Sequence, residues 1–431
     1  MNITSLSTDQ APPISVPLRF FAVAPLFLLL AALMLALSDG NLFAAAQTPA
    51  LLAATHCITL GFMAMVMMGA TQQILPVVIG SPVPASRWVA WFTSVPLGAG
   101  TLSLCGGFML GNAHLLNLAW PLLGTAFLVF IVASMLSLWR ASARNVTKTA
   151  ILLSICALAV AVSLGILLVR GFVTGAVLDY AALSAAHISL ALGGWVMLLI
   201  VGVSYQVVPM VQITPAYPKW LTAVLAPALF AILLLNLALL LIGAEQLWIA
   251  SAGISFWLLA AGFALVTLKL QRQRRRKVTD ATLSFFRLGM LSLLLAALFY
   301  LASLLLPAVA LQFRLMSAIA FIAGFAMSLI QGMLYKIIPF LVWFHLFRGG
   351  INAVKAGIPN MKEVIPDRLM WWHLWLHGGT LLVALLGPWL SAAAWLTALG
   401  LLLQGMLLSY AVFTGIVVYR RTLRRIELLA V

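Results

Sequence analysis

Stretches of about 20 apolar residues follow one another along the whole of this chain, and they constrain its fold more than any other feature. A helix of about 20 residues spans the hydrocarbon core of a bilayer, where backbone polar groups must be satisfied within the protein. We count twelve such stretches and therefore expect an all-α polytopic membrane protein with twelve transmembrane helices. The stretches lie at about 18–37, 50–79, 88–110, 114–139, 149–169, 180–210, 220–243, 246–270, 283–306, 314–343, 370–391 and 393–419.

The composition excludes a soluble protein. Hydrophobic residues make up 64% of the 431 positions and charged residues only 7%, whereas a soluble domain carries about 25% charged residues. The longest connection, at about 346–368, is too short for a separate domain, so we expect residues 1–431 to form a single membrane domain. The first stretch is longer than the apolar core of a signal peptide and lacks a basic segment before it, so we expect it to be retained.

The basic residues are distributed unevenly between the two sides of the expected bundle. When alternate loops are assigned to opposite sides, all 24 Lys and Arg residues except Arg170 and Arg314 fall on the side of the amino terminus. Loops that stay in the cytoplasm carry such an excess. We therefore expect both termini in the cytoplasm and a bacterial inner membrane as the location. The run LKLQRQRRRK fits an anchor beside anionic headgroups, and we expect no nucleic-acid partner despite the net charge of +16.

A short motif occurs three times, near the ends of the second, sixth and tenth apolar stretches. It reads GATQQILP from Gly69, GVSYQVVP from Gly202 and GMLYKIIP from Gly332, and the copies are about 130 residues apart, the length of four spans. All three copies run in the same direction across the membrane. We therefore expect three parallel four-helix units around a pseudo-threefold axis along the membrane normal, at about 18–139, 149–270 and 283–419.

Each copy of the motif ends in a proline that follows a polar residue. The proline lacks a backbone N–H, so it should end or kink its helix. The polar residues are Gln73, Gln206 and Lys336. Two interpretations remain open: these side chains satisfy the carbonyls that the prolines free, or they line a polar vestibule at the inner mouth of the bundle. Lys336 is the most informative of the three, because a charge at that depth is costly unless it is paired or reaches water.

Two histidines lie inside spans, close to the outer face of the membrane. His56 is in the second span and His187 is at a comparable depth in the sixth. A histidine within a membrane indicates a functional site, and imidazole is a common ligand of haem iron and of copper. The two differ in register, because His56 precedes its motif glycine by 13 residues and His187 by 15. On a straight helix two residues correspond to a rotation of about 200°, so the two side chains would enter different pockets.

Three further histidines lie on the cytoplasmic side. His373 and His377 are four residues apart and share a helix face, which is favourable geometry for a metal, and His345 would supply a third donor. The alternative is that the segment WWHLWLHGG anchors the helix at the membrane interface, where amphipathic rings collect. Both interpretations stay open.

Other side chains add little to the list of candidate ligands. Cys57, Cys105 and Cys156 form no CxxC pair, and we interpret them as small apolar side chains. Met63 shares a helix face with His56 and is a candidate copper ligand. None of the eight Asp and Glu residues lies in the middle of a span, which disfavours a proton-coupled pump built on buried carboxylates.

The arrangement resembles a known family. Twelve spans in three groups of four, with a histidine in the second span and another in the sixth, resemble subunit I of the haem–copper oxidase superfamily, including cbb3-type subunits and nitric oxide reductases. The segments HCITLGFMAMVMMGATQQILPVV, HISLALGGWVMLLIVGVSYQVVPMVQITPAYP and SLIQGMLYKIIPFLVWFHLF are similar to NnrS-like proteins, which contain haem and copper. The resemblance implies that His56 is an axial haem ligand and that His187 is a copper ligand.

The chain also departs from that family. An oxidase has paired histidines in the seventh span and in the tenth, but WLTAVLAPALFAILLLNLALLL and FRLMSAIAFIAGFAMSLIQG contain none. The oxygen-reducing centre and the second ligand of the low-spin haem are therefore missing. A haem would need another partner for His56, such as His187 or a methionine.

These observations favour a membrane protein that binds haem or copper through His56 and His187 and serves in respiration, electron transfer, or the handling of a gas or a metal. Complete oxidase activity is not expected, and a cytochrome or another redox protein would be its partner. The alternative is a transporter or channel with Gln73, Gln206 and Lys336 at its inner mouth. A third possibility is a partner subunit without a cofactor.

Overall fold

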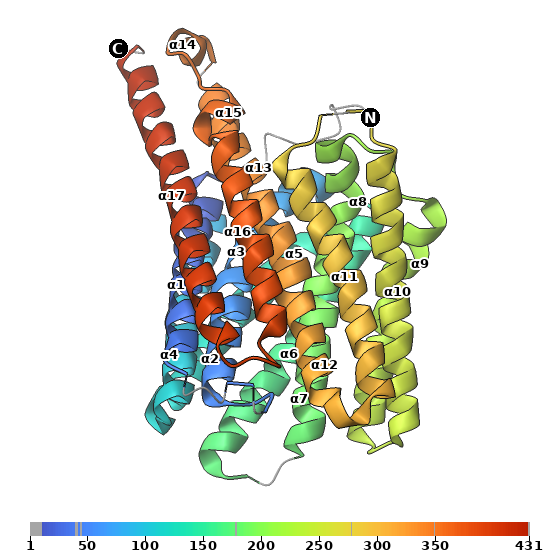
Figure 1. Ribbon diagram of the computed structural model, residues 1–431. Coiled ribbons are helices and arrows are strands. Elements are labelled where there is room, and N and C mark those ends of the chain that lie inside the picture. Colours follow the sequence, from blue (N-terminus) through green and yellow to red (C-terminus); the bar gives the residue numbers. More distant parts are fainter. Residues whose placement is uncertain are drawn as a thin grey trace.

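The computed structural model contains twelve helices that are long and apolar enough to cross a membrane. This confirms the prediction of an all-α polytopic membrane protein. The structure describes residues 11–38, 42–43, 45–176, 179–276, 278–348 and 350–429, and no β-strand occurs in these ranges. The helices stand side by side in one bundle (Figure 1).

Nine of the twelve spans are single α-helices along their length. They are α1 (Ser15–Ala36), α4 (Ser86–Leu110), α5 (Ala113–Arg140), α6 (Val146–Thr174), α9 (Lys219–Leu241), α10 (Gln246–Arg272), α11 (Ala281–Leu305), α16 (Asp367–Leu386) and α17 (Ala393–Leu428). Two short helices, α14 (Gly350–Lys355) and α15 (Met361–Val364), lie in the connection before α16.

The second, sixth and tenth spans are different, because each contains a π-helical stretch. The second span consists of α2 (Pro49–His56), η3 (Cys57–Ala64), α3 (Met65–Ile74) and η4 (Leu75–Ile79). The sixth consists of α7 (Tyr180–Ile188), η5 (Ser189–Met197) and α8 (Leu198–Gln212). The tenth consists of the 3₁₀ turn η6 (Pro307–Val309), α12 (Ala310–Ile319), η7 (Ala320–Met327) and α13 (Ser328–Phe347). The π stretches η3, η5 and η7 lie at matching places in the three spans, and η7 contacts both of the others. Such wide turns often mark functional segments.

The three groups of four spans pack on one another in a closed ring. The helix α5 packs on α6, α10 packs on α11, and the last span α17 returns to pack on α1. Within each group of four the spans contact their neighbours in chain order. The buried apolar side chains form one continuous core through the bundle.

Close approaches between helices occur at paired glycines that are eight residues apart. A Cβ added at Gly194 would lie 2.5 Å from the Cβ of Ala157, and one at Gly202 would lie 2.6 Å from the Cβ of Ala150. The same spacing recurs in the first four spans, where Gly61 lies against Phe27 and Gly69 against Phe20, and in the last four, where Gly324 lies against Ser292 and Gly332 against Phe285. Small residues allow helices to pack closely in a membrane, so these six glycines set the distance between each pair of helices.

The three motif prolines have different effects. Pro76 lies in η4, which ends at Gly80 with a positive φ of 71°. Pro209 lies in α8, which ends at Gln212 before Ile213, whose φ is 55°. Both agree with the prediction that the proline lies near a helix end. The helix around Pro339 instead continues to Phe347, so of the two predicted effects, an end or a kink, this proline does not produce an end.

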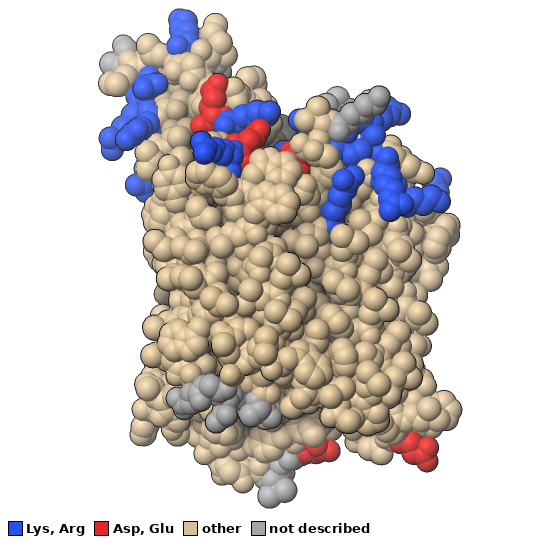
Figure 2. Space-filling model, viewed as in Figure 1, with Lys and Arg blue, Asp and Glu red and all other residues tan. Residues whose placement is uncertain are grey.

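Basic side chains collect at one end of the bundle. Figure 2 shows Lys and Arg at the end where α17 terminates, and only acidic charges at the opposite end of this face. The wide band between the two ends is uncharged on this face, as expected for a surface in contact with lipid tails. The structure is therefore that of a multi-pass membrane protein.

Candidate functional site

His56 and His187 lie at the end of the bundle opposite the basic residues. His56 is the last residue of α2, directly before η3, and His187 is the second-to-last residue of α7, directly before Ile188 and η5. The side chain of Gln47 joins the two regions, because its Nε2 lies 3.3 Å from Ser184 Oγ at the start of α7. The structure thus places the two histidines that the sequence predicts as ligands at the same end of the bundle.

Both rings are held in the same tautomer. Nδ1 of His56 lies 2.7 Å from the carbonyl oxygen of Leu52, and Nδ1 of His187 lies 2.8 Å from that of Ala161 on α6. A carbonyl only accepts, so each Nδ1 carries the proton and donates it. Each Nε2 therefore keeps its lone pair. Histidines that bind metals are commonly fixed in this way, with one nitrogen hydrogen-bonded and the other ligating.

The difference in register does not give the angle between the two side chains. The prediction of different pockets assumed a straight α-helix between each histidine and its motif glycine. The structure instead has an eight-residue π stretch after His56 and a nine-residue π stretch after His187. Because a π turn contains more residues than an α turn, the angle of 200° does not apply. Half-buried His187 packs on Gly165 of α6, where an added Cβ would lie 3.0 Å from the ring.

His373 and His377 lie inside the bundle and not at its surface. Their exposed fractions are 0% and 2%, whereas Trp372 and Trp375 on the same helix, α16, are 54% and 74% exposed. Interface anchoring therefore suits these tryptophans but does not suit the histidines. His345 has hydrogen-bond partners outside this pair of histidines. Its Nδ1 donates to Leu341 O at 3.0 Å, and its Nε2 lies 3.2 Å from Pro12 O. In the described residues no group of three or more His, Cys, Asp or Glu side chains could hold a metal ion, so the predicted three-histidine arrangement does not form.

A buried hydrogen-bonded cluster surrounds these two imidazoles. His377 Nδ1 donates to Gln404 Oε1 at 2.7 Å, and Ser328 Oγ lies 2.8 Å from His377 Nε2. The hydroxyl of Tyr335 lies 2.8 Å from His373 Nδ1, and Gln331 Nε2 donates to Gln404 Oε1 at 3.2 Å. Sequence reasoning missed this cluster, although glutamines within apolar spans were the available signal. Its side chains join the tenth, eleventh and twelfth spans and saturate His377, which leaves that ring no free nitrogen for a metal.

The three polar residues of the motif have separate environments. Lys336 Nζ forms an ion pair with Asp280 Oδ2 at 3.1 Å, and Asp280 Oδ1 also accepts from the backbone N–H of Leu283 at the start of α11. Burial acts to raise the pKa of Asp280, but the Leu283 hydrogen bond and the Lys336 charge outweigh it and leave the pKa below its usual value. Gln206 is partly exposed. Gln73 is buried, and neither atom of its amide has a partner among the described residues.

Cys57 and Cys105 are in contact, although no pattern in the sequence pairs them. Cys57 Sγ lies 3.3 Å from Cys105 Sγ, and both are thiols buried between the second span and α4. No spacing rule connects residues 48 positions apart on antiparallel helices, so only the structure finds this pair.

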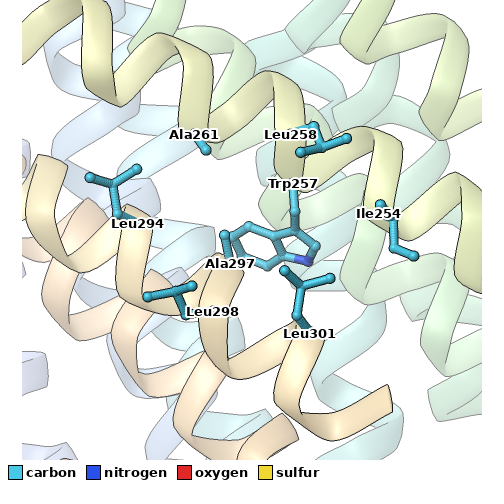
Figure 3. Close-up of a pocket in the computed structure, with 8 residues that line it drawn as sticks. All are labelled: Ile254, Trp257, Leu258, Ala261, Leu294, Ala297, Leu298 and Leu301. Atoms are coloured by element: carbon cyan, nitrogen blue, oxygen red, sulfur yellow. The ribbon is translucent and has the colours of Figure 1, made fainter. Parts of the chain in front are cut away.

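An apolar groove of about 360 Å³ lies between α10 and α11. Figure 3 shows the indole of Trp257 between the two helices, with leucines such as Leu298 and Leu301 facing it. Its lining offers almost no polar atom, so it suits lipid chains and gives a polar ligand nothing to bind.

Comparisons with known proteins do not assign the chain to a family. No protein-family model matches it, and no curated protein matches it.

Proposed function

We propose that this chain is a membrane haem protein in which His56 and His187 are the two axial ligands. The supporting observation is that two imidazoles at the same end of the bundle each hold Nδ1–H on a carbonyl and keep Nε2 free. A haem iron already has four porphyrin nitrogens and needs only two further ligands, whereas a Cu²⁺ ion prefers a tetragonal set of ligands that two imidazoles do not complete. The donor set of the structure therefore fits haem better than copper.

The proposed role is electron transfer. A bound haem would supply one-electron chemistry, and with both axial positions taken by histidine it would have no open position for a gas. The chain's own contribution is to orient the imidazoles. The carbonyls of Leu52 and Ala161 fix the tautomers, and the packing of His187 on Gly165 limits its rotation. A cytochrome or another redox protein at that end of the bundle is the proposed partner.

We further propose a fold of three pseudo-repeated units similar to subunit I of haem–copper oxidases, in a bacterial inner membrane with both termini cytoplasmic. The recurring glycine pairs and π stretches support the repeat. A hydrogen bond also recurs: Ser317 Oγ donates to Ala296 O at 2.8 Å, as His187 Nδ1 does to Ala161 O, at the same distance before the motif glycine. The basic end of the bundle supports the orientation.

The test is an absorption spectrum of the purified protein after expression with sufficient haem. We expect a Soret band that is lost in His56→Ala and in His187→Ala. The matched control is His114→Ala, because His114 is exposed at the same end of the bundle and should leave the spectrum unchanged. A wild-type protein without haem, or a Soret band that survives both substitutions, would refute the proposal.

A transporter or channel is the second candidate. The observation in its favour is the buried amides of Gln72 and Gln73, which have no partner among the described residues although each is at most 8% exposed. Unpaired polar atoms are expensive in a membrane, and a polar pathway would satisfy them. Flux of protons and small ions into proteoliposomes, followed with ion-sensitive dyes, tests this candidate. Flux that is lost in Gln73→Leu and Lys336→Ala would support it.

A further inference from the structure

The two sulfurs of Cys57 and Cys105 form a dithiol between two spans. Besides the 3.3 Å separation of the sulfurs, Cys105 Sγ lies 3.3 Å from the carbonyl oxygen of Ala53. Both side chains are buried, with exposed fractions of 0% and 1%. The third cysteine, Cys156, lies apart from them on α6 and is partly exposed.

The pair lies near the end of the bundle that carries few basic residues. Cys57 is eight residues from the start of its span at Pro49, and Cys105 is five residues from the end of α4 at Leu110. At 1.5 Å per residue, these separations place both sulfurs within roughly 12 Å of that end. An ion from the aqueous phase on that side therefore has a short path to the pair.

We propose that Cys57 and Cys105 bind one Cu⁺ ion between their sulfurs. Sulfur ligands select soft ions such as Cu⁺, and two sulfurs from different helices converge at this point. In the described part of the chain no third His, Cys, Asp or Glu joins them. A structural Zn²⁺ site needs four ligands, so the small number of donors favours a monovalent ion of low coordination number.

The charge balance also favours a monovalent ion. Cu⁺ displaces the proton of one thiol, which is released to water, and the other sulfur binds as a thiol. The oxidation state of copper and sulfur does not change. The positive ion and the single thiolate cancel, so no net charge is placed in the apolar interior, where an isolated charge is expensive.

Binding requires a small movement of the two helices. Two metal–sulfur bonds of roughly 2.3 Å, the length in zinc thiolates, place linearly opposed sulfurs about 4.6 Å apart. The present separation is 3.3 Å, so the sulfurs must separate by roughly an ångström. We expect rotation of the two short side chains and a slight shift of α4 to supply this separation.

This inference does not depend on the haem proposal, since it uses sulfur atoms and not imidazole nitrogens. The two sites are nevertheless adjacent in sequence at His56 and Cys57. The experiment therefore includes a variant of each site, so that the loss of copper and the loss of haem can be separated.

The experiment is a titration of the reduced, full-length protein in detergent with Cu⁺ under anaerobic conditions, against a chromophoric Cu⁺ chelator. We expect wild type to remove one equivalent of Cu⁺ from the chelator. Cys57→Ser and Cys105→Ser should weaken binding by at least about tenfold, which is about 1.4 kcal/mol. Cys156→Ser is the matched control and should bind as wild type does, and so should His56→Gln even if it loses haem.

A spectroscopic readout supports the assignment. X-ray absorption of the copper-loaded protein should show sulfur neighbours only. Elution as a single species checks that each variant is folded, and Cys57→Ala replaces Cys57→Ser if the serine variant aggregates. The proposal is overturned if wild type takes up no Cu⁺, if either cysteine variant keeps wild-type affinity, or if His56→Gln alone abolishes copper binding, which would assign the copper to the histidine site.

Discussion

The contact between Gly202 and Ala150 makes a quantitative prediction about how closely two membrane helices pack. In Gly202→Ala the new Cβ would lie 2.6 Å from the Cβ of Ala150, whereas carbon atoms in favourable contact are about 3.5–4.0 Å apart. Neither methyl group has a rotamer through which it could move away. The helices α6 and α8 must therefore separate by roughly an ångström, and the bundle around them must adjust.

The expected cost follows from two opposing effects. Overpacking of a close-packed interior costs about 1–3 kcal/mol, while replacing a helical glycine with alanine gains about 0.5–1 kcal/mol. Gly262 is in the interior of α10, and a Cβ added there would have nothing within 4 Å. Gly262→Ala therefore shows only the stabilisation that comes from replacing a helical glycine with alanine. The difference in unfolding free energy between the two variants isolates the clash, and we expect it to be about 1–3 kcal/mol.

The assay is reversible unfolding in mixed micelles with increasing SDS, followed by circular dichroism. Ala150→Gly supplies the second half of a double-mutant cycle, because it removes the atom with which the new Cβ collides. Gly202→Ala combined with Ala150→Gly should recover most of the loss. Equal stability of Gly202→Ala and Gly262→Ala, or no recovery in the double variant, would refute the reasoning.

Three further predictions follow from single contacts. Asp280→Asn keeps the acceptor for the backbone N–H but loses the charge that pairs with Lys336, and the loss should be at most about 1 kcal/mol because the pair is partly exposed. Because the pKa of Asp280 is lowered in the folded protein, this group stabilises the wild type above about pH 3.9. The stabilisation is lost as the pH falls through the lowered pKa. Unfolding curves of Asp280→Asn should lack this pH dependence. His377→Ala removes the buried partner of Ser328 Oγ and one of the two donors to Gln404 Oε1. It should lower the unfolding free energy by about 1–3 kcal/mol, measured in the same micelle assay; a neutral effect would contradict the cluster. Gly165→Ala should displace the ring of His187, which lies 3.0 Å from the new Cβ, and shift the Soret band from its wild-type position; an unshifted band would contradict the role of His187.

The spans were predictable from the sequence because the signal is local. Each run of apolar residues reports on its own surroundings, and all twelve expected stretches coincide with helices of the structure. Their ends were less predictable, as the tenth span shows: it was expected at about 314–343 and extends from Pro307 to Phe347. The helix continues past Pro339 to Phe347, because a proline removes one hydrogen bond to the preceding turn and leaves the following turns their own donors.

The histidine sites were less predictable because they depend on contacts between spans. Residue type and depth alone select His56 and His187, and their role as ligands stays a prediction. The rotation of about 200° assumed straight α-helices, and no residue pattern announces the π stretches that the structure contains. The sequence also left a surface position open for His373 and His377, because tryptophans dominate their segment. The partners that hold the two histidines inside come from two other spans.

Comparison of the three units distinguishes features that serve packing from features that serve function. The glycine pairs occur in all three and are explained by helix packing. At the position of His187 the other units have Ser317, which makes the equivalent hydrogen bond, and Ala54, which cannot. The hydrogen bond alone therefore needs no imidazole, because a serine makes it with a smaller side chain. What only His187 adds is a free Nε2 lone pair, which helix packing does not require, and this addition is the physical reason for proposing that His187 is a ligand.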